Sequence, residues 1–323
     1  MPTLLKLHAY FVFVMNFRVA YRGLLSLMLI AGIHTPLIAQ ENSPAEETSP
    51  EVLALLDSVE HALHSVSYRG IYTYEHAGVL ESIKVTHTID ESKEAAKLEH
   101  LTGRLSKPIV YRSDLGSCQN ALNPHAGVFS RDNLTEHYHF RPLGFDRIAG
   151  RQVVVLNADP KDEYRFRYQV AIDRQTGLPL LLSLVDGENL LERFQFIEFD
   201  PITELPVPEV AVSGEDYLLD GGCRELANSS RWRLAWLPSG FRLVSVKLNQ
   251  SADMLSYSDG ISRFSIFVSE TPNGNTLEGE ARRGGTFVYL DKASAGSRIF
   301  QVAVVGEVPE ATLRKLAASV RPK

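Results

Sequence analysis

The histidines at positions 137 and 139 are the residues whose type and spacing come nearest to a metal site. They lie in Glu136-His137-Tyr138-His139, and residues two positions apart share one face of a strand. A zinc site needs three or four ligands, and no further ligand is supplied nearby. We interpret both side chains as solvent-exposed histidines of a loop and predict no metal site.

Asp114, Ser117 and Cys118 are the other residues that could take part in catalysis. A serine or cysteine nucleophile needs a base within hydrogen-bond reach, and no histidine can be assigned to this group. The chain also lacks the GxSxG, HExxH, CxxC, P-loop and GxGxxG motifs. The sequence therefore predicts no catalytic residue, no enzyme activity and no cofactor.

Aromatic side chains recur with a period of two, which places them on one face of a strand. They have two interpretations: an ordinary sheet core, or the wall of a curved half-barrel that encloses an apolar ligand. Under the second interpretation, the candidate lipid-binding residues are Tyr72, Tyr74, Phe166, Tyr168, Phe194 and Phe196.

The segment 144–199 is predicted to form the sheet that positions many of these residues. It contains four strand-like runs, 151–158, 164–173, 179–185 and 190–199, separated by turn residues such as glycine and proline. Connections this short favour antiparallel pairing. One face of the sheet is apolar and the other is charged, so helices, a second sheet or a ligand must cover the apolar face.

Further elements are expected before this segment. Ser49-Pro50 suits the start of a helix, with serine as N-cap and proline in the first turn. Four strands are expected at 68–75, 80–89, 95–101 and 108–112. The segment 113–142 is irregular in pattern and is expected to form a loop or short helices over the sheet.

The second half is expected to be a smaller unit. Residues 200–222 are rich in proline, glycine and acids, which is typical of an inter-domain linker and its flanks. Beyond them, the pattern predicts a small antiparallel sheet and a closing helix at 309–320. Trp236 is expected to anchor the core of this unit.

The N-terminus predicts a secretory signal peptide over residues 1–39. This stretch holds three basic residues, no acid and a short apolar run at 24–33, which is too short for a membrane span. We expect translation to begin at Met15. The rest of the chain keeps 30 of the 33 basic residues and all 39 acids, so its formal charge is −9. That charge argues against a nucleic-acid binder.

The two cysteines, Cys118 and Cys223, are far apart in sequence. In an oxidising compartment they could pair, but two cysteines do not make a disulfide framework. Their pairing stays open.

Several short motifs, in shared order and spacing, make the chain resemble the RseB/MucB family of periplasmic regulators of the envelope-stress sigma factor. The resemblance covers nearly the whole chain after the signal peptide. Its residues are 68–74 (YRGIYTY), 147–151 (RIAGR), Tyr168, Asp173, 176–179 (TGLP), Leu184, Asp186, 236–241 (WLPSGF), 257–260 (YSDG) and 305–309 (VGEVP).

The resemblance implies an α+β protein with two domains. The first, at 49–200, would be a half-open antiparallel β-barrel with helices, like the lipoprotein carriers of the LolA type. A linker at 201–229 would lead to a smaller partner-binding domain at 230–323, an antiparallel sheet with one helix. It also implies a periplasmic protein that binds the periplasmic segment of a membrane-anchored anti-sigma factor and shields it from site-one proteolysis. Lipid or lipopolysaccharide acyl chains would weaken the binding of that anti-sigma segment.

Two functions therefore stay open at this point: a regulator that binds a protein partner and senses lipid, and a carrier of lipid or lipoprotein. The second domain favours the regulator, because a shuttle needs no additional domain. A hydrolase is a distant third. The sequence leaves homo-oligomerisation and the identity of the lipid open.

Overall fold

The computed structural model describes residues 48–90, 93–103, 107–114, 129–203, 215–219, 230–248, 252–271 and 275–323. The predicted signal peptide, Ser117, both cysteines and most of the predicted linker lie outside these ranges.

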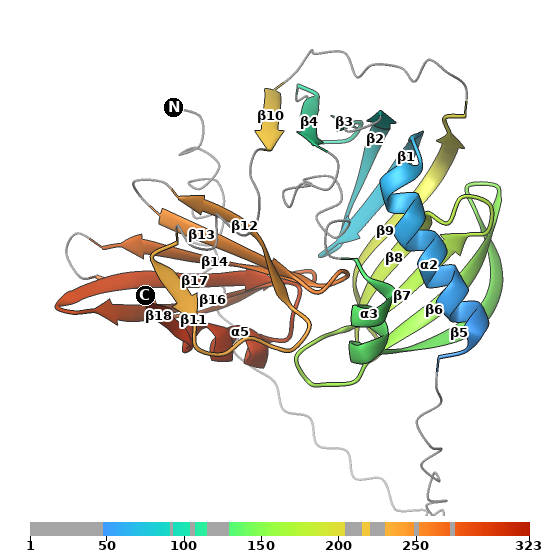
Figure 1. Cartoon of the computed structure of the whole chain (residues 1–323). Coiled ribbons are helices and arrows are strands. Elements are labelled where there is room, and N and C mark those ends of the chain that lie inside the picture. Colours follow the sequence, from blue (N-terminus) through green and yellow to red (C-terminus); the bar gives the residue numbers. More distant parts are fainter. Residues whose placement is uncertain are drawn as a thin grey trace, which may run out of the picture. The chain divides into compact units, whose positions relative to one another are not determined.

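Ten strands form the larger sheet, in the order β10-β4-β3-β2-β1-β9-β8-β7-β6-β5 (Figure 1). All neighbours are antiparallel except β10, which runs parallel to β4. The two outer strands, β5 and β10, are not paired with each other, so the sheet stays open over the described residues. This arrangement confirms the antiparallel pairing that the sequence pattern predicts and the half-open sheet that the family resemblance implies. The strands are β1 (Tyr68–His76), β2 (Val79–Asp90), β3 (Lys93–His100), β4 (Ile109–Asp114), β5 (Tyr138–Ile148), β6 (Arg151–Pro160), β7 (Arg167–Asp173), β8 (Pro179–Asp186), β9 (Asn189–Pro201) and β10 (Glu215–Leu219).

Helix α2 (Pro50–Ser65) lies across this sheet (Figure 1). It begins as predicted, because the Ser49 hydroxyl accepts a hydrogen bond from the Val52 amide at 3.4 Å and Pro50 occupies the first turn. Its buried face repeats at helical spacing and packs into the same apolar core as the sheet. The members of that face are Val52, Leu56, Val59, Ala62 and Leu63. The helix thus covers the apolar face that a one-sided sheet must bury.

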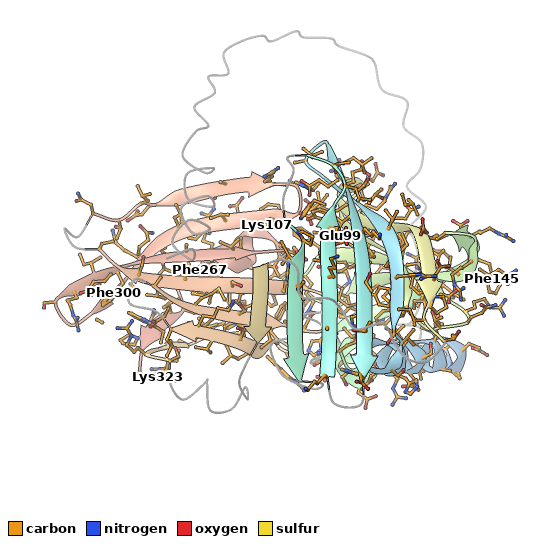
Figure 2. The ribbon with its side chains drawn as sticks, turned by 90° about the horizontal axis from the view of Figure 1, so that it is seen from above. Glu99, Lys107, Phe145, Phe267, Phe300 and Lys323 are labelled. Carbon is orange, nitrogen blue, oxygen red and sulfur yellow. The ribbon has the colours of Figure 1, made fainter. Side chains whose placement is uncertain are left out.

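The segment 113–142 is more regular than predicted where it is described. It contains helix α3 (Arg131–His137) and the start of β5, so the sheet resumes at Tyr138 and not at Arg151. The alternation that would have revealed β5 is broken by a β-bulge between Pro142 and Gly144. Phe145 follows this bulge at the far edge of the sheet and is 75% exposed (Figure 2).

Six strands form the smaller sheet, in the order β12-β13-β14-β17-β16-β15. Helix α5 (Glu310–Ala317) packs on β16 and β17, and β11 pairs with β18 beside it. The expected small antiparallel sheet with a closing helix is therefore confirmed. The strands are β11 (Trp232–Leu234), β12 (Arg242–Leu248), β13 (Ala252–Ser258), β14 (Arg263–Glu270), β15 (Gly279–Arg283), β16 (Thr286–Ala295), β17 (Arg298–Gly306) and β18 (Val320–Pro322).

Trp232, rather than Trp236, is the buried tryptophan of this part of the chain. Its side chain is 4% exposed and packs edge-on against Phe300, with the ring centres 4.9 Å apart. Trp236 is half buried and contacts both the Tyr164 ring and the Lys315 ammonium. We call residues 50–219 the large-sheet module and residues 230–323 the small-sheet module.

Candidate functional site

A cavity of about 520 Å³ lies between the apolar face of the large sheet and helix α2. Leu56, Val59 and Leu63 line it from the helix, and most of its other lining residues are aromatic or aliphatic side chains of the sheet. Its volume falls within the range of pockets that hold small organic ligands. The arrangement suits the binding of an apolar molecule by exclusion of water.

Aromatic rings of β1 and β9 form one wall of the cavity. The register places Tyr72 opposite Phe196 and Tyr74 opposite Phe194. The Tyr72 and Phe194 ring centres are 4.6 Å apart, and those of Phe194 and Phe196 are 5.2 Å apart. Contacts at these distances add to the free energy of area burial and hold the rings in place. The wall is therefore formed before any ligand arrives.

Five of the six predicted lipid-binding residues line this cavity: Tyr72, Tyr74, Tyr168, Phe194 and Phe196. The sixth, Phe166, does not. It precedes β7, is buried, and packs against Phe287 of the small-sheet module with the ring centres 5.6 Å apart. Whether the five residues bind lipid stays a prediction.

Phe199 is a cavity residue that the sequence pattern missed. A register shift in the pairing of β1 with β9 leaves Ile197 without a partner, and Ile197 is 54% exposed. After this bulge the inward positions change from even to odd numbers, so Phe199 points inward with Phe194 and Phe196. Alternation read along the sequence alone cannot show such a shift.

One end of the cavity is charged, and the small-sheet module supplies part of it. Tyr74 and Glu192 come from β1 and β9, while Arg263 and Glu307 come from the start of β14 and the residue after β17. Burial raises the pKa of Glu307 above the usual carboxyl value, and the charge of Glu192 adds to this effect. The lining therefore combines many apolar side chains with a small charged cluster, which we call the ionic end.

Glu192 connects the two modules at this end. Its carboxylate accepts hydrogen bonds from the Tyr74 hydroxyl and, at 2.8 Å, from the Gly285 amide in the turn before β16. A Cβ atom on Gly285 would lie 2.3 Å from a methyl group of Leu184, so a larger residue here would displace that side chain. Burial, followed by the hydrogen bond to Glu192, raises the pKa of Tyr74 far above its ordinary value.

A second, fully buried connection joins the modules around Arg165, in the loop before β7. The Arg165 Nε atom lies 2.7 Å from Oδ2 of Asp259, and neither side chain is exposed. Arg165 also donates hydrogen bonds to the Asp162 carboxylate and to the Ser239 carbonyl. Its guanidinium lies 4.9 Å from the centre of the Phe241 ring. Ser239 and Phe241 belong to one of the motifs that carry the family resemblance, and Asp259 to another. These motifs therefore build the contact between the modules.

His137 takes part in the same contact, so its interpretation as an exposed loop residue was wrong. It is 7% exposed, lies at the end of α3, and its Nδ1 is 2.8 Å from the Asn133 carbonyl oxygen. Asn133 in turn donates to the backbone carbonyl of Asp259 at 2.7 Å. Within the described residues, no three His, Cys, Asp or Glu side chains are grouped to hold a metal ion.

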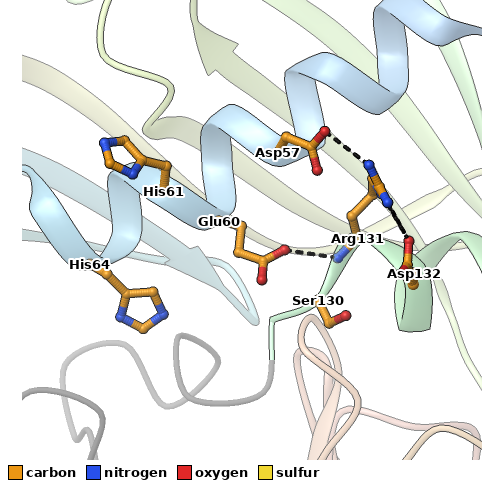
Figure 3. Close-up of a pocket in the computed structure, with 7 residues that line it drawn as sticks. All are labelled: Asp57, Glu60, His61, His64, Ser130, Arg131 and Asp132. Atoms are coloured by element: carbon orange, nitrogen blue, oxygen red, sulfur yellow. Dashed lines mark hydrogen bonds and ion pairs between the residues drawn. The ribbon is translucent and has the colours of Figure 1, made fainter.

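A second pocket lies on the surface between α2 and α3 (Figure 3). Arg131 occupies its acidic side: the guanidinium lies 3.0 Å from Asp57 and 2.8 Å from Asp132, and the backbone amide donates to Glu60 at 3.2 Å. Two of the three carboxylates are thus paired with an arginine side chain, and the third accepts from its backbone amide. We interpret this pocket as the contact that holds α3 against α2.

No helix in the described parts of the chain has the length and apolar character needed to cross a membrane.

Comparison with known proteins gives matches along both modules. The family models of the MucB/RseB N-terminal and C-terminal domains match residues 51–212 and 227–321. The sigma factor AlgU regulatory protein MucB of Pseudomonas aeruginosa is 27% identical over 316 residues, covering 92% of this chain and 97% of that protein. The sigma-E factor regulatory protein RseB of Haemophilus influenzae is 26% identical, covering 88% of this chain and 95% of that protein.

The fold agrees with these sequence matches. The crystal structure of MucB in complex with MucA(peri) aligns with a TM-score of 0.67 at 27% identity, covering 84% of this chain and 99% of the solved one. The structure of MucB on its own aligns with a TM-score of 0.64 at 26% identity. With both domains matched in order over most of their length, the chain belongs to the MucB/RseB family.

Proposed function

We propose that this protein is a periplasmic negative regulator of the envelope-stress response. In this role it binds the periplasmic segment of a membrane-anchored anti-sigma factor, shields that segment from site-one proteolysis, and acts as a binding protein rather than an enzyme. The observation that carries the proposal is the match of both modules to MucB, including the MucB that was solved in complex with MucA(peri).

The experiment uses the chain from residue 40 onward and the periplasmic segment of an anti-sigma factor from the same genome, encoded beside an extracytoplasmic sigma factor. Calorimetric titration should give a saturable complex, and the bound segment should resist the site-one protease for longer than the free segment. The control is the same segment with its residues in scrambled order. Absence of binding, or equal cleavage rates with and without this protein, would contradict the proposal.

We also propose that the cavity binds an acyl chain and that this event opposes partner binding. Burial of each methylene contributes about 0.8 kcal/mol, so even a partly inserted chain can offset the ordering cost of binding. Glu192 joins the cavity to the small-sheet module and Arg165 joins the two modules beside it, which supports a physical route from ligand to partner. Because binding free energies are reciprocal, saturating partner must lower lipid affinity by the same factor as lipid lowers partner affinity.

A carrier of lipid or lipoprotein is the second candidate, and the 520 Å³ apolar cavity is the observation that favours it. A carrier accelerates the transfer of a labelled lipid between donor and acceptor vesicles in proportion to its concentration. A regulator needs only to bind lipid. Transfer that is no faster than in buffer alone would leave the regulator as the function of this fold.

A further inference from the structure

The ionic end of the cavity carries one arginine and one carboxylate that are held side by side by the backbone. The Glu307 amide donates to the Arg263 carbonyl at 2.9 Å, and the Ser262 hydroxyl donates to the Glu307 carbonyl at 2.9 Å. Gly306, just before Glu307, lies so close to Phe264 that a Cβ atom there would be 2.4 Å from the Phe264 Cβ. The two side chains are therefore fixed as neighbours by the edges of β14 and β17, not by their own attraction.

Their mutual contact is incomplete. The Arg263 Nε atom lies 3.6 Å from the Glu307 carboxylate, which is beyond hydrogen-bond distance. Glu307 is mostly buried, with 21% of its side chain exposed, while Arg263 is half exposed. A mostly buried carboxylate whose one cation lies beyond hydrogen-bond distance gains free energy from a donor that comes closer.

Glu192, the other carboxylate at this end, differs in this respect. It accepts hydrogen bonds from Tyr74 and from the Gly285 amide, so its charge is already solvated by the protein. Arg263 and Glu307 are consequently the two groups at this end that are free to exchange their weak mutual contact for contacts with a ligand.

We propose that Arg263 and Glu307 form a head-group subsite for a zwitterionic amphiphile whose acyl chain occupies the apolar part of the cavity. The phosphate of such a head would contact Arg263, and its primary ammonium would donate to Glu307. The proposal rests on the proposed acyl-chain site and adds the chemical class of the ligand.

Other head groups fit this end less well. A fatty-acid carboxylate or a phosphoglycerol head pairs with Arg263 alone and brings a third negative charge beside Glu307 and Glu192. A head with a phosphate and an ammonium satisfies both groups and adds no net charge to a mostly buried site. The subsite therefore selects by charge pattern, while the aromatic wall accepts any chain that fits.

The test compares lysophosphatidylethanolamine with lysophosphatidylglycerol of the same acyl chain, each titrated below its micelle concentration into the full chain from residue 40 and followed by calorimetry and native mass spectrometry. The unmodified protein should bind the ethanolamine lipid about tenfold more tightly, as expected when one charged hydrogen bond is made or lost. Glu307→Gln should remove this preference, and Arg263→Gln should weaken binding of both lipids.

Glu270→Gln is the matched control. Glu270 ends the same strand that Arg263 begins, and it forms a comparable contact of 3.4 Å with Arg298 away from the cavity, so its loss should change neither affinity. Equal affinity of the unmodified protein for the two lipids would overturn the head-group subsite while leaving the acyl-chain site intact. Binding of neither lipid would overturn both.

Discussion

Arg165 and Asp259 form an ion pair between the two modules in which neither side chain has any exposed surface. Asp259 is also satisfied by the Tyr138 hydroxyl at 3.0 Å and by the backbone amides of Ile261 and Ser262. Burial raises the pKa of Tyr138 well above its ordinary value, so this hydroxyl keeps its proton and acts as a donor. Every charge in the contact therefore has partners, which is the condition for a buried ion pair to be tolerated.

Removal of Arg165 should be strongly destabilising. Arg165→Met leaves Asp259 buried without its cation, and breaking such a pair from one side costs about 3–5 kcal/mol. Urea denaturation measures the free energy of unfolding. Arg298→Met is the control, because the Arg298–Glu270 pair is exposed and its loss should cost about 0–1 kcal/mol. A loss below about 1 kcal/mol for Arg165→Met would show that the contact contributes little to stability.

The two tryptophans should respond differently to truncation. Trp232→Ala removes a buried ring from the core beside Phe300 and should cost about 3–5 kcal/mol. Trp236→Ala removes a half-buried ring, with its contact to Lys315 at 4.0 Å, and should cost about 1–2 kcal/mol. Thermal melting of both variants checks the order. The reverse order would show that Trp236 is the anchor that the sequence suggested.

Much of the cavity could be predicted from the sequence, because the rings of β1, and those of β9 up to Phe196, follow alternation. Tyr72, Tyr74, Phe194 and Phe196 lie where a period of two places them. The prediction for Phe166 applied the same period to residues before Arg167. The strand β7 begins only at Arg167, and Phe166 still belongs to the preceding loop. Alternation has no meaning outside a strand, so this residue packs on the other module instead.

The charged end of the cavity could not be predicted. Arg263 and Glu307 are 44 residues apart and lie more than 60 residues beyond the aromatic wall, and the pairing of β14 with β17 brings them together. Nothing in the local pattern around either residue signals a cavity. The cavity takes in these two residues only because the small sheet meets the large one there. The bulges at Ile197 and near Gly144 were missed for a similar reason, since a bulge is defined by the partner strand.

Stability should depend on pH through Glu307. Its pKa is raised in the folded protein, mainly by burial, above its value in the unfolded chain. The folded state therefore binds this proton more tightly, so the resulting stability is fully present below the unfolded pKa and is lost as pH rises through the folded pKa. The glutamine of Glu307→Gln cannot ionise, so the unfolding free energy of this variant does not fall with rising pH for this reason. The difference in unfolding free energy between variant and unmodified protein should grow as pH rises from about 4 to 8, and a constant difference in urea titrations would contradict the assignment.

The predicted boundary between the domains, within 201–222, also contains β10, which pairs with β4, so limited proteolysis should cut beside this strand rather than in it. Exposed linkers carry few contacts and are cut first. A protease of broad specificity at low concentration should release two resistant fragments, and mass spectrometry should place the first cuts in this segment. Early cuts inside 144–199, with a resistant fragment that spans 201–222, would move the boundary.

A charge in the aromatic wall should separate lipid binding from partner binding. Phe194→Asp places a carboxylate among Tyr72, Phe196 and the apolar lining, and an acyl chain there cannot solvate it. We expect lipid affinity to fall at least about tenfold and affinity for the anti-sigma segment to fall less. Ile197→Asp is the matched control, because Ile197 is on the same strand, exposed at the bulge, and absent from the cavity lining. Both variants must first melt within a few degrees of the unmodified protein. Unchanged lipid affinity in a folded Phe194→Asp protein would show that these rings form an ordinary sheet core. An equal loss of both affinities would show that lipid and partner bind to one surface.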